Sequence, residues 1–138
     1  MDRAAGPTRI SVFRRFTDLD TLGHINNVVY FDYLQEARIG LLRDIGLVKA
    51  EDFAQVVVKQ EIVHRKPLYL SPEPLIVETW IEGLRNSSYT VRYRIIDEHG
   101  DVAAEASTVC AVVDPVTTKP IRIHDELRAV LEPLTIGR

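Results

Sequence analysis

Two acidic residues, a glycine, a histidine and two asparagines lie close together in the segment FTDLDTLGHINNVVYFDYLQEAR, which runs from Phe16 to Arg38. An acyl transfer needs a polarised carbonyl group and, beside it, a nucleophile or a general base. Free backbone N–H groups at the start of a helix can stabilise the oxyanion that such a reaction forms. The segment offers both parts, because Asp20 carries a carboxylate and Asn27 directly precedes an apolar pattern of helical spacing.

The glycine of this segment predicts how the two parts meet. Gly23 permits a turn that a residue with a Cβ atom tolerates poorly, and such a turn would bring Asp18 and Asp20 back towards the helix start. The side chain of Asn27 is expected to cap the helix. Asp, Gly and Asn are also the usual residues of turns and caps, so composition alone leaves a purely structural interpretation open.

A metal site is a further possibility that the residue types raise. His24 together with Asp18 and Asp20 could hold a cation, but divalent metal sites generally need more ligands. The other histidines lie on unrelated segments, at His64, His99 and His124. We therefore expect no metal and no cofactor. Cys110 lies within an alternating strand pattern without a nearby activating residue, so it is expected to be a small core residue and not a nucleophile.

The apolar pattern predicts which elements hold these residues in place. A strand is expected at Thr8 to Arg14, and a long helix begins after the polar loop and ends near Gly46. Its apolar face contains Tyr30, Tyr33, Leu34, Ala37, Leu41 and Ile45. Four strands are expected to follow, at Gln55 to Arg65, Leu75 to Leu84, Ser88 to Asp97 and Val102 to Asp114. A last short helix would bury Leu127, Val130 and Leu131.

One long helix followed by consecutive strands predicts an α+β class with an antiparallel sheet packed on the helix. Gly40 lies inside the helix, where it would let a strand approach the helix axis closely. The segment from Val102 to Val113 carries apolar residues on both faces, and one helix can cover only one of them. A second subunit is therefore expected to cover the other face.

Composition limits the class of protein. The chain has 138 residues of which 46% are hydrophobic, which fits one compact domain over residues 1–138. With 17 basic and 20 acidic residues and a net charge of -3, it has no basic block that favours nucleic acid. The single Cys110 excludes an internal disulfide framework, and no apolar run approaches the roughly 20 residues that span a bilayer. We expect a cytoplasmic protein that does not bind a membrane.

The polar motif also carries a family resemblance. The residues from Asp18 to Tyr33, continued by Glu36, Ala37 and Arg38, resemble the signature of the 4-hydroxybenzoyl-CoA thioesterase-type branch of hot-dog-fold acyl-CoA thioesterases. Weaker agreement extends along nearly the whole chain, including Arg65-Lys66-Pro67 and Lys119-Pro120. The resemblance implies a long central helix wrapped by a curved antiparallel sheet, with active sites at the interface of a homodimer or homotetramer.

The family's site residues carry over to individual positions of this sequence. The catalytic carboxylate falls on Asp20, and the amide that polarises the thioester carbonyl falls on Asn27. The resemblance also implies substrate-binding positions, at Gly23, His24, Arg85 and Lys119. Of these, Arg85 and Lys119 fall near positions where relatives place cations for the nucleotide phosphates of CoA.

Other motif residues are expected to support the fold. Asp18 matches a second carboxylate of the motif and is at least as well explained by structural support. Glu36 and Arg38 are expected to pair or to brace the helix. The segment Ser71-Pro72-Glu73-Pro74 departs from the Gly-Asp turn of many relatives, so the shape of that loop does not follow from the resemblance.

The resemblance implies an acyl-CoA thioester hydrolase that releases a carboxylic acid and free CoA. The role of Asp20, as nucleophile or as general base, stays open. Two alternatives also remain: a thioesterase that acts on an acyl-carrier-protein thioester, and a non-catalytic acyl-CoA-binding or sensor protein. The presence of Asp20 argues against a pure binding protein, and no proline- and glycine-rich loop with a histidine supports a dehydratase.

Overall fold

The computed structural model describes residues 6–43 and 54–136. The elements in chain order are β1 (Thr8–Val12), α1 (Val29–Leu41), β2 (Ala54–His64), β3 (Leu75–Glu82), β4 (Ser88–Ile96), β5 (Val102–Val113) and α2 (Asp125–Leu131). Short 3₁₀ helices lie at Phe16–Asp18 and Glu132–Leu134. The expected strands are confirmed to within two residues at each end. Among the helices of these two ranges, none has the length and apolar character needed to cross a membrane.

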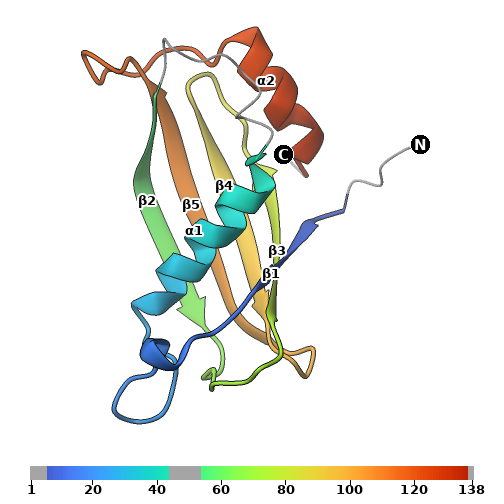
Figure 1. Ribbon diagram of the computed structural model, residues 1–138. Coiled ribbons are helices and arrows are strands. Elements are labelled where there is room, and N and C mark those ends of the chain that lie inside the picture. Colours follow the sequence, from blue (N-terminus) through green and yellow to red (C-terminus); the bar gives the residue numbers. More distant parts are fainter. Residues whose placement is uncertain (1–5, 44–53, 137–138) are drawn as a thin grey trace.

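The strands form a five-stranded sheet in the order β1-β3-β4-β5-β2, with antiparallel pairing throughout. The helix α1 lies diagonally across one face of this sheet (Figure 1). This arrangement confirms the α+β class and the hot-dog layout of a long helix on an antiparallel sheet. Because β1 and β2 are the outer strands, the eleven residues of β2 leave a long free edge.

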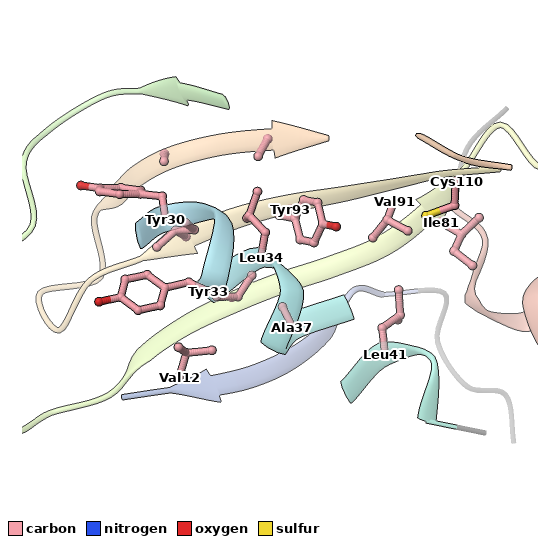
Figure 2. Packing of buried hydrophobic residues seen from close by; sticks show 14 of the residues in the cluster. Val12, Tyr30, Tyr33, Leu34, Ala37, Leu41, Ile81, Val91, Tyr93 and Cys110 are labelled. Atoms are coloured by element: carbon pink, nitrogen blue, oxygen red, sulfur yellow. The ribbon is translucent and has the colours of Figure 1, made fainter. Parts of the chain in front are cut away.

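The core lies between α1 and the facing side of the sheet (Figure 2). The predicted apolar face of the helix is confirmed, because Tyr30, Tyr33, Leu34, Ala37 and Leu41 are all buried. Ile45 and Gly46, where the helix was expected to end, lie outside the described residues. The alternation of β4 is confirmed as well, and its buried side chains are Tyr89, Val91, Tyr93 and Ile95. Cys110 is buried in the same core.

The opposite face of the sheet is largely charged. Arg94 forms an ion pair with Glu78 at 3.0 Å, and Arg92 lies 3.4 Å from Glu82. On this face the expected uncovered apolar surface of β5 is confined to Val109 and Ala111, which are partly exposed, because Glu105 and Ser107 occupy the rest of its outer side. The neighbouring strand β2 adds further exposed apolar residues, since Val56, Val57, Val58 and Val63 are 41%, 45%, 59% and 51% exposed.

Gly40 confirms the expected close approach of a strand to the helix. A Cβ atom built at this position would lie 2.7 Å from Ile10 Cδ1 and 3.3 Å from Ile10 Cγ1. Ile10 belongs to β1, so the glycine lets this edge strand pack directly on α1. A residue with a branched Cβ has no room there without a shift of β1.

Gly40→Val is therefore expected to lower the free energy of unfolding by about 1–3 kcal/mol, the usual cost of overpacking. Gly40→Ala is the matched control. Its single methyl group meets only side-chain atoms of Ile10, the nearest of which is the terminal Cδ1, and alanine improves helix propensity by about 1 kcal/mol, so its effect should be near zero. Urea unfolding of both variants measures the difference, and equal stabilities would contradict this account of the contact between α1 and β1.

Candidate active site

The polar loop before α1 folds back on itself around Gly23. The Asp20 N–H donates to the His24 carbonyl at 2.8 Å, and the Gly23 N–H donates to the Asp20 carbonyl at 3.1 Å. Gly23 has a φ of 80°, in the left-handed region that favours glycine. The predicted turn is confirmed, and it places Asp20 in a short loop that leads directly into the helix.

The two oxygens of the Asp20 carboxylate differ in their surroundings. Oδ1 accepts hydrogen bonds from the Leu22 N–H at 2.9 Å and from the His24 N–H at 3.2 Å. Within the described ranges Oδ2 has no hydrogen-bond partner, and the residue is partly exposed. One oxygen therefore fixes the loop, while the other is available to a substrate or to water.

Asp18 is enclosed by protein groups. The residue is 2% exposed, and its carboxylate accepts hydrogen bonds from the Tyr33 hydroxyl at 2.6 Å and from the Arg15 N–H at 3.0 Å. The Arg15 guanidinium lies 2.9 Å from it. Burial raises the pKa of Asp18, but the hydrogen bonds from Tyr33 and Arg15 together outweigh burial and hold the pKa below its usual value. This carboxylate supports the loop, as the sequence suggested.

The helix start differs from the prediction in one respect. Val28 is the N-cap residue and receives no side-chain cap, so the expectation that the Asn27 side chain caps the helix is wrong. Asn26 makes the local side-chain contact instead, because its Oδ1 accepts from the Val28 N–H at 2.9 Å. The shift occurs because the regular helix begins at Val29, later in the chain than the apolar pattern alone indicated.

The backbone amide of Asn27 is nevertheless available. The N–H groups that follow are engaged: Val29 donates to the Asn26 carbonyl at 2.9 Å and Tyr30 to the Asn27 carbonyl at 3.3 Å. The Asn27 N–H has no acceptor in the part of the chain that the structure describes. A free donor next to a helix start can polarise a carbonyl oxygen.

The loop presents apolar side chains around these polar groups. Phe16, Leu22 and Val28 are 77%, 76% and 71% exposed. The His24 ring packs edge-on against Tyr69, with 5.0 Å between the ring centroids. Gly23 is exposed beside it. The surroundings of Asp20 therefore resemble a binding surface more closely than an ordinary solvated turn.

The β3–β4 hairpin and the loop after β5, which contain Arg85 and Lys119, lie at the other end of the sheet from this loop (Figure 1). The Arg85 guanidinium is held within its own hairpin, where it donates to the Gly83 carbonyl at 2.8 Å and to Thr90 Oγ1 at 3.0 Å. Lys119 lies in the exposed loop after β5, and its ammonium group forms no ion pair with any described residue. One chain alone thus does not bring these two cations to Asp20.

Two side-chain contacts of α1 were not predicted from the sequence. The ring of His64, at the end of β2, packs edge-on against Tyr30 in the first turn of α1, with 4.6 Å between centroids. Arg38 reaches across the core to the Tyr93 hydroxyl at 3.1 Å. It does not pair with Glu36, so of the two expected roles the structure supports the bracing one. Both contacts join segments far apart in the sequence, and no local pattern signals them.

Comparison with known proteins shows which family and which relatives the sequence matches. Residues 14–131 match the model of the thioesterase-like superfamily. The long-chain acyl-CoA thioesterase FadM of Escherichia coli (strain K12) is 31% identical over 120 residues, which cover 84% of this chain and 90% of that protein.

Solved structures agree with this match. The probable thioesterase YbaW from Escherichia coli is 31% identical, with a TM-score of 0.77 over 94% of this chain and 98% of that chain. A thioesterase complexed with coenzyme A and Zn from Thermus thermophilus is 28% identical, with a TM-score of 0.80 over 96% and 97% of the two chains.

Proposed function

Because this chain belongs to the thioesterase-like superfamily, we propose that it is an acyl-CoA thioester hydrolase, which releases a carboxylic acid and free CoA. One observation carries the proposal: the Gly23 turn places a carboxylate with a free oxygen in the loop that leads into a helix start with a free N–H group. The name of the FadM relative and the CoA bound in the Thermus thermophilus structure support CoA as the carrier.

We propose complementary roles for the two groups. The Asn27 N–H would donate to the thioester carbonyl oxygen and stabilise the negative charge that develops there. Asp20 Oδ2 would either attack the carbonyl carbon, to give an acyl-enzyme that water then hydrolyses, or remove a proton from an attacking water molecule. In both routes the C–S bond breaks, and the CoA thiolate takes up a proton on release.

The free edge of β2 supports a homodimer. A long edge strand with exposed valines is a ready template for pairing with another strand. The most economical partner is a second copy of the same edge, because a two-fold axis between two β2 strands pairs them antiparallel. Such a pairing would cover the exposed side chains of Val56, Val57 and Val58 in both copies.

This pairing would also complete the site. Since β2 ends near the loop before α1 and begins near the loop after β5, antiparallel pairing reverses the ends of the second copy (Figure 1). Lys119 of the partner subunit would then lie at the same end of the assembly as Asp20. The cations at the far end of one chain would in this way serve the site of the other.

Release of free thiol from a panel of acyl-CoAs, with short, long and aromatic acyl groups, tests the proposed function. Hydrolysis of at least one of them at rates well above the uncatalysed reaction is the expected result. Tight binding of acyl-CoA with no thiol release from any substrate would instead identify an acyl-CoA-binding protein. Hydrolysis confined to acyl-carrier-protein thioesters would identify that protein as the substrate carrier.

Lys119→Ala is expected to raise the KM for acyl-CoA several-fold with little change in kcat. A cation that contacts the nucleotide does so equally in the ground state and in the transition state, so its loss affects binding alone. The effect should weaken in high salt, because exposed charges are screened. Arg85→Ala should also raise the KM, and in addition should lower the melting temperature because its guanidinium holds the β3–β4 hairpin.

Steady-state kinetics with a truncated substrate provides the control. Acyl-N-acetylcysteamine thioesters lack the nucleotide, so their KM should be the same in Lys119→Ala and the unmodified protein. A similar rise in KM for the full and truncated thioesters would remove Lys119 from the nucleotide site.

A further inference from the structure

A polar cluster of four residues, Arg38, Gln60, Tyr93 and Thr108, lies between α1 and the inner face of the sheet. Arg38 Nη1 donates to the Tyr93 hydroxyl at 3.1 Å and to Thr108 Oγ1 at 3.5 Å. The Tyr93 hydroxyl donates to Thr108 Oγ1 at 2.8 Å, and Thr108 Oγ1 donates to Gln60 Oε1 at 3.2 Å. Tyr93 and Thr108 are 1% and 0% exposed, whereas Arg38 is partly exposed and Gln60 is exposed, so the cluster runs from the core to the open side of β2.

The polar cluster carries an uncompensated positive charge. Arg38 is only partly exposed, and no carboxylate lies within ion-pair distance of it in residues 6–43 and 54–136. Its three partners are neutral, since burial raises the pKa of the Tyr93 hydroxyl above its usual value. A guanidinium has five N–H donors, and the cluster uses only those of Nη1. The remaining donors, on Nε and Nη2, are not buried and have no partner among the described residues, so they are available to an anionic ligand.

The polar cluster faces the same side of α1 as the proposed thioester site. Gly40 packs on β1, which places the stripe from Asn27 through Phe31 to Arg38 towards β4, β5 and β2. Helix α1 packs mainly on β1 and β3, and it leaves the middle of β2 open while Tyr30 packs against His64 at the end of that strand. The β2 residues that share the inner face with β5, such as Val57 and Gln60, accordingly remain exposed in one chain. An extended ligand could follow this stripe.

The distance between the Asn27 amide and the Arg38 side chain sets the length of such a ligand. Arg38 follows Asn27 by eleven residues, which corresponds to about 16 Å along a helix axis. The Arg38 side chain slants back towards the helix start, which shortens the span by a few ångströms. At roughly 1.3 Å of advance per C–C bond, the span corresponds to an acyl chain of about ten carbons.

We propose that the polar cluster is the far end of the acyl site and that it binds the terminal carboxylate of an ω-carboxyacyl-CoA of about ten carbons. The free Nη2 and Nε groups of Arg38 would donate to the two carboxylate oxygens, the pairing for which a guanidinium is best suited. This inference rests on the proposed function, because it takes the Asn27 amide as the position of the thioester carbonyl. It assigns Arg38 to substrate specificity in addition to its bracing of the helix.

Binding of non-hydrolysable analogues tests the inference without relying on hydrolysis. The probes are S-(2-oxoalkyl)-CoA analogues, in which a methylene separates the carbonyl from the sulfur, with chains of about eight to fourteen carbons that end in a methyl or a carboxylate group. Calorimetry should find the carboxylate series bound at least about tenfold more tightly than the methyl series at the best length. Arg38→Met should abolish this preference and leave affinity for the methyl series nearly unchanged.

Two further variants keep the test decisive. Arg92→Met removes an arginine from the opposite, outer face of the sheet and should leave the preference intact. Thr108→Val removes one Arg38 contact while keeping the side-chain volume, and it should reduce the preference. This variant provides the test in case Arg38→Met does not fold. Equal affinity of the unmodified protein for both series, or an equal loss for both in Arg38→Met, would overturn the inference and leave Arg38 as a helix brace. If the Arg38-dependent preference persists but no acyl-CoA is hydrolysed, the proposed function fails and the inference stands.

Discussion

Asp20→Asn is expected to reduce thioester hydrolysis by at least about a hundredfold, the scale on which a positioned base or nucleophile acts, while changing the melting temperature little. This substitution should remove the charge of residue 20 without disturbing the loop that holds it. An asparagine keeps an Oδ1 atom that can accept the Leu22 and His24 N–H groups, so the loop retains its two fastening hydrogen bonds. What the variant loses is the negative charge, and with it the reactive oxygen that faces outward.

Single-turnover thiol release and thermal unfolding of the same preparations measure the two effects separately. Asp32→Asn is the matched control, because it removes an exposed carboxylate from the first turn of α1 and should leave turnover near normal. Asp18→Asn should show the opposite balance, with a lower melting temperature and a smaller loss of turnover, since that carboxylate is buried against Tyr33 and Arg15. Near-normal turnover of a folded Asp20→Asn protein would sink the mechanism, and a larger rate loss at Asp18 would reverse the assignment.

The double substitution Val57→Lys and Val58→Lys should convert a dimer to monomers and lower hydrolysis of acyl-CoA by about tenfold or more. Charged side chains on an edge strand block its pairing with another strand, and a two-fold axis places the added charges of the two copies near each other. The loss of rate, measured at acyl-CoA concentrations below KM, should exceed that of Lys119→Ala because both Arg85 and Lys119 of the partner subunit would leave the Asp20 end of the assembly.

Light scattering across a range of protein concentrations, together with kinetics on the same samples, checks this expectation. Ile39→Lys introduces the same charge at an isoleucine that is 62% exposed and lies on the outer side of α1, away from the β2 edge. It should change neither assembly nor rate. A fully active monomer at assay concentrations, in the unmodified or the substituted protein, would reject a site shared between two copies.

Local patterns in the sequence were sufficient to locate the elements and, for α1 and β4, the face that each buries. The spacing of Tyr30, Tyr33 and Leu34 located the buried side of α1, and the alternation through Tyr89 and Tyr93 located that of β4. Gly40 indicated the close approach of a strand because a residue with a branched Cβ does not fit that contact. These features depend on residues a few positions apart, which is why sequence reasoning reached them.

Local sequence patterns did not predict the features that depend on segments far apart in the chain. Arg38 meets residues 55 and 70 positions later in the chain, and nothing near it in the sequence indicates those contacts. The apolar run in β2 is typical of a buried strand, yet the order of the sheet places it at an edge. Asn27 and Asn26 are chemically identical candidates for the side-chain contact at the helix start, and only the backbone path selects Asn26.

The two edges of the sheet differ in a way that bears on how far self-association can proceed. Pairing through β2 would consume the long edge of each copy and leave β1 as the outermost strand on both sides. β1 has only five residues, and its central part is fixed by Arg9, Ile10 and their contacts with β3 and α1. Short edges with a charged side chain are poor templates for further strands. An isologous contact of this kind therefore ends at two copies and protects the protein against growth into fibrils.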